Sequence, residues 1–271
     1  MFLKTTKMTW CGAKVVRTSL VGFVLLVQAV SAQDQDGQEN AEVQDGLKNA
    51  LAAANVLKIT ADDGQEIERM QDEVYLYIDP IRKSLEGSVW VWGTQGRPSA
   101  LVTLSRNSDV VWFAEVVSFA PQPLQVRGSK LTGKLSLNKL EGQDAPAETA
   151  KERKAQLRTI AQKFSGVQMW DNDGRTGMQE YKLRCREKPV LVYEDADNKV
   201  LSGAIFLFLY GSNPELALIL EATNDGWQYG FGRMGWAAVT VEFDGKKVFE
   251  QPKLELGRGD DRYSMVFLPL Q

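Results

Sequence analysis

The sequence predicts an α+β fold in which one unit occurs twice in tandem. Each copy is a helix packed on an antiparallel β-meander, and the two copies dock together. Three observations lead to this prediction: apolar residues alternate with period two over most of the chain, two segments instead show helical spacing, and the chain matches itself at a fixed offset. One continuous antiparallel sheet that carries two helices is the alternative arrangement.

The first 32 residues have the three parts of a secretory signal peptide. Basic residues lie between Lys4 and Arg17, a short apolar run covers Leu20 to Val27, and Val30-Ser31-Ala32 supplies the small residues of a cleavage site. The apolar run is shorter than the roughly 20 residues that a membrane span needs, so we expect no membrane span in the mature chain; an uncleaved anchor is the alternative. The protein is therefore predicted to be exported, to the periplasm or the cell exterior.

Charge and residue types restrict the function classes. Residues 1–32 hold four basic and no acidic residues, so the remaining chain has 28 basic and 35 acidic residues and a net charge of −7. This balance argues against nucleic acid and anionic membranes as partners, because both require clustered Lys and Arg.

The chain has no histidine, which excludes Ser-His-Asp and Cys-His catalysis and the usual histidine-ligated zinc sites. Cys185 is the cysteine that remains after processing, and we expect it to be a small buried apolar residue.

The first α+β repeat is predicted at 42–138, after a polar leader at 33–41 that we expect to be disordered. Its helix covers about 42–54. Strands are expected near 57–60, 66–71, 74–78, 88–93, 99–105, 110–118 and 124–127.

The second repeat is predicted at 147–271, after a linker at 139–146 where the apolar pattern is lost. Its helix covers about 147–164 and has an apolar face that includes Leu157 and Ile160. Strands are expected near 167–170, 179–186, 190–193, 204–209, 216–222, 227–231, 237–243 and 263–268.

The two copies match each other when the chain is shifted by 116 positions. Nine of the 36 positions from 74 to 109 are then identical without a gap, where chance gives about two. The identical residues are Val74, Tyr77, Asp79, Lys83, Leu85, Gly87, Pro98, Leu104 and Asp109, which fall on Val190, Tyr193, Asp195, Lys199, Leu201, Gly203, Pro214, Leu220 and Asp225. Two unrelated meanders with similar turns are the alternative.

The central strands of the two copies are apolar on both faces. Trp90 and Trp92 share one face of their strand, while Val89 and Val91 fill the other. Residues 205–208 repeat this pattern in the second copy. We therefore expect each meander to pack on its own helix with one face and on the other copy with its second face.

Two motifs resemble ligand sites but have a simpler explanation. The stretch 230–235 fits GxGxxG, yet a strand rather than a helix is expected to follow it, so we interpret it as a twisted or bulged strand. The runs 171–174 and 195–199 resemble the start of calcium loops, but cations occupy required ligand positions, as Lys199 does in the second run. The sequence predicts no metal and no cofactor.

Two kinds of candidate site residue remain. Asp79 and Asp195 occupy equivalent positions and would form a carboxylate pair if the copies are related by a twofold axis, although both also suit turns. Among the tryptophans, Trp170 and Trp236 flank turn-like sequence, so they are the candidate binding residues, by stacking on a ligand. The sequence identifies no catalytic residue.

The motifs also carry a family resemblance. Tyr77-x-Asp79, Gly87 before an apolar strand, Gly96-Arg97-Pro98, and the repetition of this order after a helix with Ala161 and Phe164 at its end look like a family of uncharacterised, internally duplicated exported proteins of planctomycete-type bacteria. The second copy departs from the pattern with Ser212-Asn213-Pro214. The resemblance implies export and duplication, and it assigns no catalytic residue.

The sequence thus favours an exported, non-catalytic binding or interaction protein with a protein or glycan partner. A carboxylate-based hydrolase that acts on polysaccharide is one alternative, and a structural protein of the cell envelope is the other.

Overall fold

The computed structural model describes residues 48–79, 84–106, 111–171, 177–255 and 259–269. All of them belong to one compact unit, Lys48–Gln271. The predicted signal peptide at 1–32 and the predicted disordered leader at 33–41 lie outside the described residues.

The unit is mostly β, and the predicted α+β arrangement is wrong. Strands make up 53% and helices 10% of the described residues, and the sheets are large, curled and antiparallel. The prediction assigned a helix to cover each meander, but much of the sheet surface is covered by further strands instead. For example, β9 (Phe164–Trp170) pairs with β15 (Ala238–Phe243), which is far away in sequence, and a local apolar pattern does not specify such a pairing.

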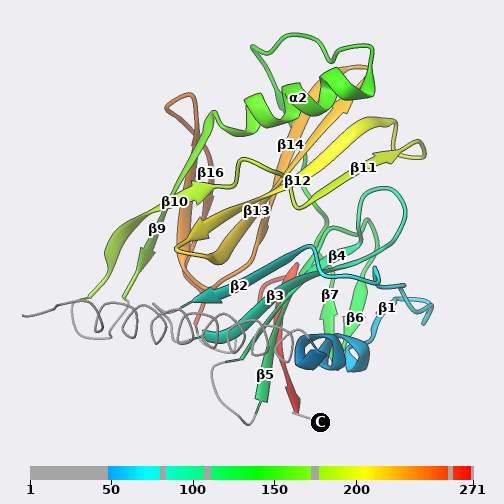
Figure 1. The fold of residues 1–271 in the computed structure, drawn as a ribbon, viewed down its shortest axis with the longest axis vertical. Coiled ribbons are helices and arrows are strands. Elements are labelled where there is room, and N and C mark those ends of the chain that lie inside the picture. Colours follow the sequence, from blue (N-terminus) through cyan, green and yellow to red (C-terminus); the bar gives the residue numbers. More distant parts are fainter. Residues whose placement is uncertain (1–47, 80–83, 107–110, 172–176, 256–258, 270–271) are drawn as a thin grey trace, which may run out of the picture. The chain divides into compact units, whose positions relative to one another are not determined.

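The strands form three sheets, so the alternative of one continuous sheet is also wrong. The first sheet has the order β17-β5-β4-β3-β2 (Figure 1). Its strands are β2 (Tyr75–Asp79), β3 (Ser84–Trp92), β4 (Ala100–Arg106), β5 (Val111–Ser118) and β17 (Tyr263–Pro269). A small third sheet, β1-β6-β7, consists of β1 (Ile59–Ala61), β6 (Leu124–Val126) and β7 (Ser129–Leu131).

The second sheet has nine strands in the order β16-β15-β9-β10-β12-β13-β14-β8, with β11 paired to β12. Its strands are β8 (Asn138–Leu140), β9 (Phe164–Trp170), β10 (Gln179–Cys185), β11 (Leu191–Asp195), β12 (Val200–Tyr210), β13 (Asn213–Thr223), β14 (Gly226–Arg233), β15 (Ala238–Phe243) and β16 (Lys246–Gln251). β8 occupies the start of the segment that the sequence predicted to be a linker.

Two helices are described. Residues 48–56 are helical, and α2 (Ala150–Ala161) lies across the second sheet (Figure 1). α2 begins at the N-cap residue Thr149, whose side chain accepts a hydrogen bond from the backbone N–H of Glu152. It buries Leu157, Ile160 and Ala161. It is shorter than predicted, because β9 already begins at Phe164.

The meander β2–β4 and the meander β11–β13 have the same register at the offset of 116. Tyr75 pairs with Val89 as Leu191 pairs with Ile205, and Trp90 pairs with Val102 as Phe206 pairs with Leu218. Both meanders also have an irregularity at the same place, between Tyr77 and Asp79 and between Tyr193 and Asp195.

A tyrosine ring covers a glycine across each of these strand pairs. A Cβ atom on Gly203 would lie 2.4 Å from the ring of Tyr193, and one on Gly87 would lie 2.3 Å from the ring of Tyr77. Since no side chain fits between ring and strand, the position of each tyrosine ring requires a glycine on the neighbouring strand.

The apolar core has three parts. Two of them each lie on one face of one large sheet, and the third lies between the two sheets. Trp90 and Trp92 pack with the helix 48–56 and the third sheet. Phe206 and Phe208 pack with α2. A third cluster lies between the sheets and takes Val89 and Val91 from the first and Ile205 and Leu207 from the second.

No helix in the described part of the chain has the length and the apolar character that a membrane crossing requires.

Candidate functional site

A cavity of about 290 Å³ lies where the two large sheets meet. Its walls come from the end of β5, the end of β14, the end of β16 with the segment after it, and the segment before β17. A second cavity of about 250 Å³ lies beside Trp227, but its charged residues Lys139, Glu141 and Asp225 are exposed. The first cavity is the candidate site, because it has buried polar groups as well as an apolar wall.

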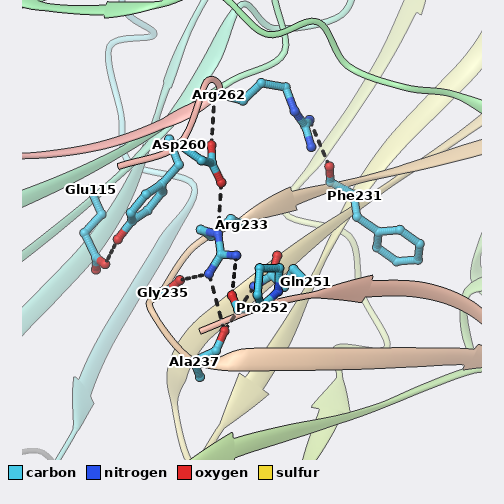
Figure 2. A network of polar contacts seen from close by, with 10 residues as sticks. Glu115, Phe231, Arg233, Gly235, Ala237, Gln251, Pro252, Asp260 and Arg262 are labelled. Carbon is cyan, nitrogen blue, oxygen red and sulfur yellow. Dashed lines mark hydrogen bonds and ion pairs between the residues drawn. The ribbon is translucent and has the colours of Figure 1, made fainter. Parts of the chain in front are cut away.

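Arg233, the last residue of β14, is the central charged group of this cavity (Figure 2). Only 5% of the residue is exposed. Its Nε donates to Asp260 Oδ2 at 3.2 Å, its Nη2 to the Pro252 carbonyl at 2.7 Å, and its Nη1 to the carbonyls of Gly235 and Ala237 at 3.2 and 3.4 Å. Burial lowers the pKa of Arg233, and the charge of Asp260 opposes this effect. An arginine remains charged even so, and here it ties together the segments that follow β14 and β16 and precede β17.

The segment before β17 is held in place by backbone hydrogen bonds. The Asp260 N–H donates to the Tyr263 carbonyl at 2.9 Å, and the Arg262 carbonyl accepts from Ser118 N at 2.8 Å. The Asp260 carboxylate also accepts from the Arg262 backbone N–H at 2.8 Å. These hydrogen bonds fix the backbone that carries Arg262, and they fix Asp260, which pairs with Arg233.

Tyr263 adds a second fully buried polar side chain. Its hydroxyl donates to the Glu115 carboxylate of β5 (Figure 2). Burial, and then the charge of Glu115, raise the pKa of Tyr263 well above its usual value. The phenol is thus neutral at physiological pH and positions the start of β17 on β5.

The apolar wall is formed by Val117, Phe249, Pro252 and Leu254. Phe249 of β16 packs on Phe231 of β14 with a distance of 4.6 Å between ring centroids. β16 and β14 are at distant positions in the strand order of the second sheet, so this contact shows that the sheet curls back on itself at the cavity.

The glycine motif at 230–235 leads into this site, and its residues 230–233 are strand, as predicted. β14 contains them without a shift of register against β13. A Cβ atom on Gly230 would lie 2.7 Å from the Ser136 carbonyl oxygen, one on Gly232 2.4 Å from the Phe119 ring, and one on Gly235 2.7 Å from the Glu215 carboxylate. The glycines therefore allow three other segments to approach β14, and the predicted bulge is absent from this pairing.

A second polar network joins the two large sheets. Arg97, in the turn after β3, donates from Nε and Nη2 to the two carboxylate oxygens of Glu221 at 2.7 and 2.8 Å. Glu221 is fully buried and also accepts from the Tyr193 hydroxyl at 2.6 Å and from Gln228 Nε2 at 2.7 Å. Burial opposes the charge of Arg97, but the hydrogen bonds and charge of Glu221 outweigh it and raise the pKa of Arg97.

The two residues of the predicted carboxylate pair, Asp195 and Asp79, have different surroundings. Asp195 accepts from Arg97 N at 2.9 Å and from the backbone and side chain of Asn198 at 3.1 and 2.8 Å. Burial opposes ionisation of this carboxyl, but these hydrogen bonds prevail and lower its pKa, so it suits a turn rather than a proton donor. Asp79 is fully buried at the end of β2.

The two predicted tryptophans flank the segment that follows β16, and neither lines the cavity. The Lys253 ammonium lies 5.5 Å from the ring centroid of Trp170. The Trp236 carbonyl accepts from the Leu254 N–H at 2.8 Å. Both residues are half-buried, so the structure places them next to the candidate site without making them part of its wall.

Metal ligation has no geometric support in the part of the chain that the structure describes. No group of three or more Cys, Asp and Glu residues there is placed to hold a metal ion. Most of the predicted calcium-like run at 171–174 lies outside the described residues. In the run at 195–199, Lys199 takes a positive φ of 57°, which is typical of a tight turn.

Cys185 is expected to react slowly with iodoacetamide in the folded protein. Burial raises the pKa of this thiol to about 12, against the charge of Arg184, whereas a free cysteine titrates near 8.5. At pH 8 the thiolate fraction is then roughly three orders of magnitude below that of the unfolded chain, and the rate should rise about tenfold per pH unit up to pH 10. Mass spectrometry of the Cys185 peptide measures this, with the urea-unfolded chain as control; equal rates in both states would contradict it.

The sequence did not single out Arg233, Asp260, Arg262 or Tyr263. One signal was present, because Arg233 is a charged residue in an apolar strand, and such a residue requires a buried partner. Its partner Asp260 lies 27 positions further along the chain, in a polar stretch that has no pattern of its own.

Comparisons with protein-family models, with curated proteins and with solved structures find no match to this chain. The fold and the cavity by themselves therefore define it as a β protein of three antiparallel sheets with a partly open, polar and apolar cavity where the two large sheets meet. The resemblance to exported, duplicated planctomycete-type proteins stays a prediction.

Proposed function

We propose that this protein is an exported, non-catalytic binding protein whose ligand occupies the cavity between the two large sheets. The observation that carries the proposal is the cavity itself: its volume is about 290 Å³, and its lining includes the apolar Phe249 and Leu254 and the buried Arg233. Cavities with apolar walls and a few fixed polar groups are the usual form of small-ligand sites.

The chemistry of the site supports binding rather than reaction. Arg233 donates to three backbone carbonyls and one carboxylate, and the neutral phenol of Tyr263 donates to Glu115. These groups are held by protein partners, so they shape the cavity without exchanging protons with a ligand near pH 7. Export, to the periplasm or the exterior, rests on the sequence of residues 1–32.

We further propose that the two meanders arose by duplication. The common register, the common irregularity and the tyrosine over glycine at the offset of 116 support this. So does a reciprocal contact of the hairpin tips. Arg97 donates to Asp195 of the second meander, and Ser212 donates to the Ile78 carbonyl of the first.

The experiment is ligand capture from the native host. Purified protein is equilibrated with an envelope and medium extract, separated from it, and its bound molecules, glycan fragments included, are identified by mass spectrometry. We expect the wild type to retain a compound that the cavity-filling variant Leu254→Trp loses. The matched control is Leu76→Trp, at an exposed position outside the cavity. Equal retention by both variants, or no retained compound, would overturn the proposal.

A further inference from the structure

The two arginines of the cavity differ in how far their hydrogen-bonding capacity is used. Arg233 is committed through Nε, Nη1 and Nη2. The Arg262 guanidinium donates from Nη1 to the Phe231 carbonyl at 3.1 Å. Within the described ranges, its Nε and Nη2 atoms donate to no protein group, and it forms no ion pair. Its Nε–Nη2 edge is therefore available to a ligand.

The same protein shows what such an edge binds. Arg97 uses its Nε and Nη2 atoms to hold both oxygens of the Glu221 carboxylate at 2.7 and 2.8 Å. This is the bidentate arrangement that makes guanidinium the preferred partner of carboxylates. Arg262 is one of the residues that line the cavity, and no group of the described residues uses its corresponding pair of donors.

Three carboxylates also line the cavity, and two of them form ion pairs with basic side chains. Asp260 is paired with Arg233, and Glu250 with Lys247 at 2.7 Å. Asp261 is exposed, and its carboxyl group lies beside Gly133, where a Cβ atom would be 2.5 Å away. Asp261 is therefore the acid that opposes an anionic ligand most directly.

The remaining wall sets the size and character of the ligand. Val117, Phe249, Pro252 and Leu254 are apolar, and Phe249 presents an aromatic ring. A volume of about 290 Å³ lies at the lower end of the range for small-ligand sites, so it suits a body on the order of ten non-hydrogen atoms.

We propose that the cavity binds a small monocarboxylate with an apolar or aromatic body, held by the Nε–Nη2 edge of Arg262. The inference rests on the proposed binding function and specifies its ligand class. Arg233 holds the surrounding segments in place, and Arg262 binds the carboxylate of the ligand. The apolar part of the ligand packs against Phe249.

The test uses a matched pair of probes, 4-fluorophenylacetate and its neutral analogue 4-fluorophenylacetamide, with Kd measured by ¹⁹F NMR. We expect the carboxylate to bind at least about tenfold more tightly than the amide, because a charge-assisted pair replaces a neutral one. Arg262→Gln should remove this preference, Arg262→Lys should restore part of it, and Asp261→Asn should strengthen carboxylate binding severalfold. Arg158→Gln, at an exposed position of α2, is the control and should leave both affinities unchanged.

Circular dichroism and urea unfolding establish that each variant is folded before its affinity is compared. Equal affinity for the two probes, an unchanged preference in Arg262→Gln, or no binding of the carboxylate would each overturn the inference. The proposed binding function is judged separately, by the retained compound and by Leu254→Trp. A neutral compound retained through the cavity would support that function and contradict the carboxylate.

Discussion

Replacing Glu221 by glutamine is expected to lower the free energy of unfolding by about 3–5 kcal/mol, because it leaves the half-buried Arg97 guanidinium without the charge of the fully buried Glu221. Glu221 is fully buried and accepts hydrogen bonds from Arg97, Tyr193 and Gln228. Urea unfolding followed by tryptophan fluorescence measures the change.

Two further variants separate the charge from the packing. Arg97→Met in the Glu221→Gln background removes the unpaired cation, so part of the lost stability should return. Glu250→Gln removes an exposed ion pair with Lys247 and should change stability by at most about 1 kcal/mol. A loss below about 1 kcal/mol in Glu221→Gln would mean that the network does not hold the two sheets together.

The second large effect is expected from the aromatic residues at equivalent positions of the two meanders. Trp90→Ala and Phe206→Ala should each cost about 3–5 kcal/mol, because both side chains are almost completely buried in separate parts of the core. Both variants should shift the midpoint of one common transition. The reason is that the cluster of Val89, Val91, Ile205 and Leu207 makes each large sheet part of the other's core.

Calorimetry and urea unfolding of both variants test this, with Phe267→Ala as the control. Phe267 is 52% exposed, so its removal should cost at most about 1 kcal/mol. Two transitions, with Trp90→Ala moving one and Phe206→Ala moving the other, would show that the sheets are independent.

The local elements were largely predictable, and the assembly was not. Alternating apolar residues located β2 to β5 and β11 to β14 to within a few residues, because half-buried strands impose period two on the sequence. The same rule failed at 66–71, where only isolated bridges at Glu66 and Arg69 occur. It also missed β7, β8 and β16, which are short or lie at the edge of their sheets.

The prediction of the architecture was wrong for a different reason. β8 pairs with β14, and β9 pairs with both β10 and β15, so a single sheet collects segments from 138 to 251. Nothing in a local pattern states which strand edge meets which. The helix-on-meander prediction therefore underestimated how much of each sheet is covered by β-structure.

The candidate site was not predictable for the same reason. Its cavity is lined by Val117, Gln251 and Tyr263, which belong to β5, β16 and β17. The tryptophans singled out from the sequence lie beside the cavity because turn-like sequence marks the ends of strands. The polar groups that define its chemistry come from a short segment that has no periodic signal.

The position of β17 has a consequence for the order in which parts of the chain can fold during synthesis. This strand contains residues 263–269, yet it pairs with β5 at 111–117, and Tyr263 closes the cavity against Glu115. The first sheet cannot be completed before β17 has left the ribosome, long after β5. Until β17 is available, the edge of β5 lacks this partner and the binding site is open, and closing both joins residues about 150 positions apart.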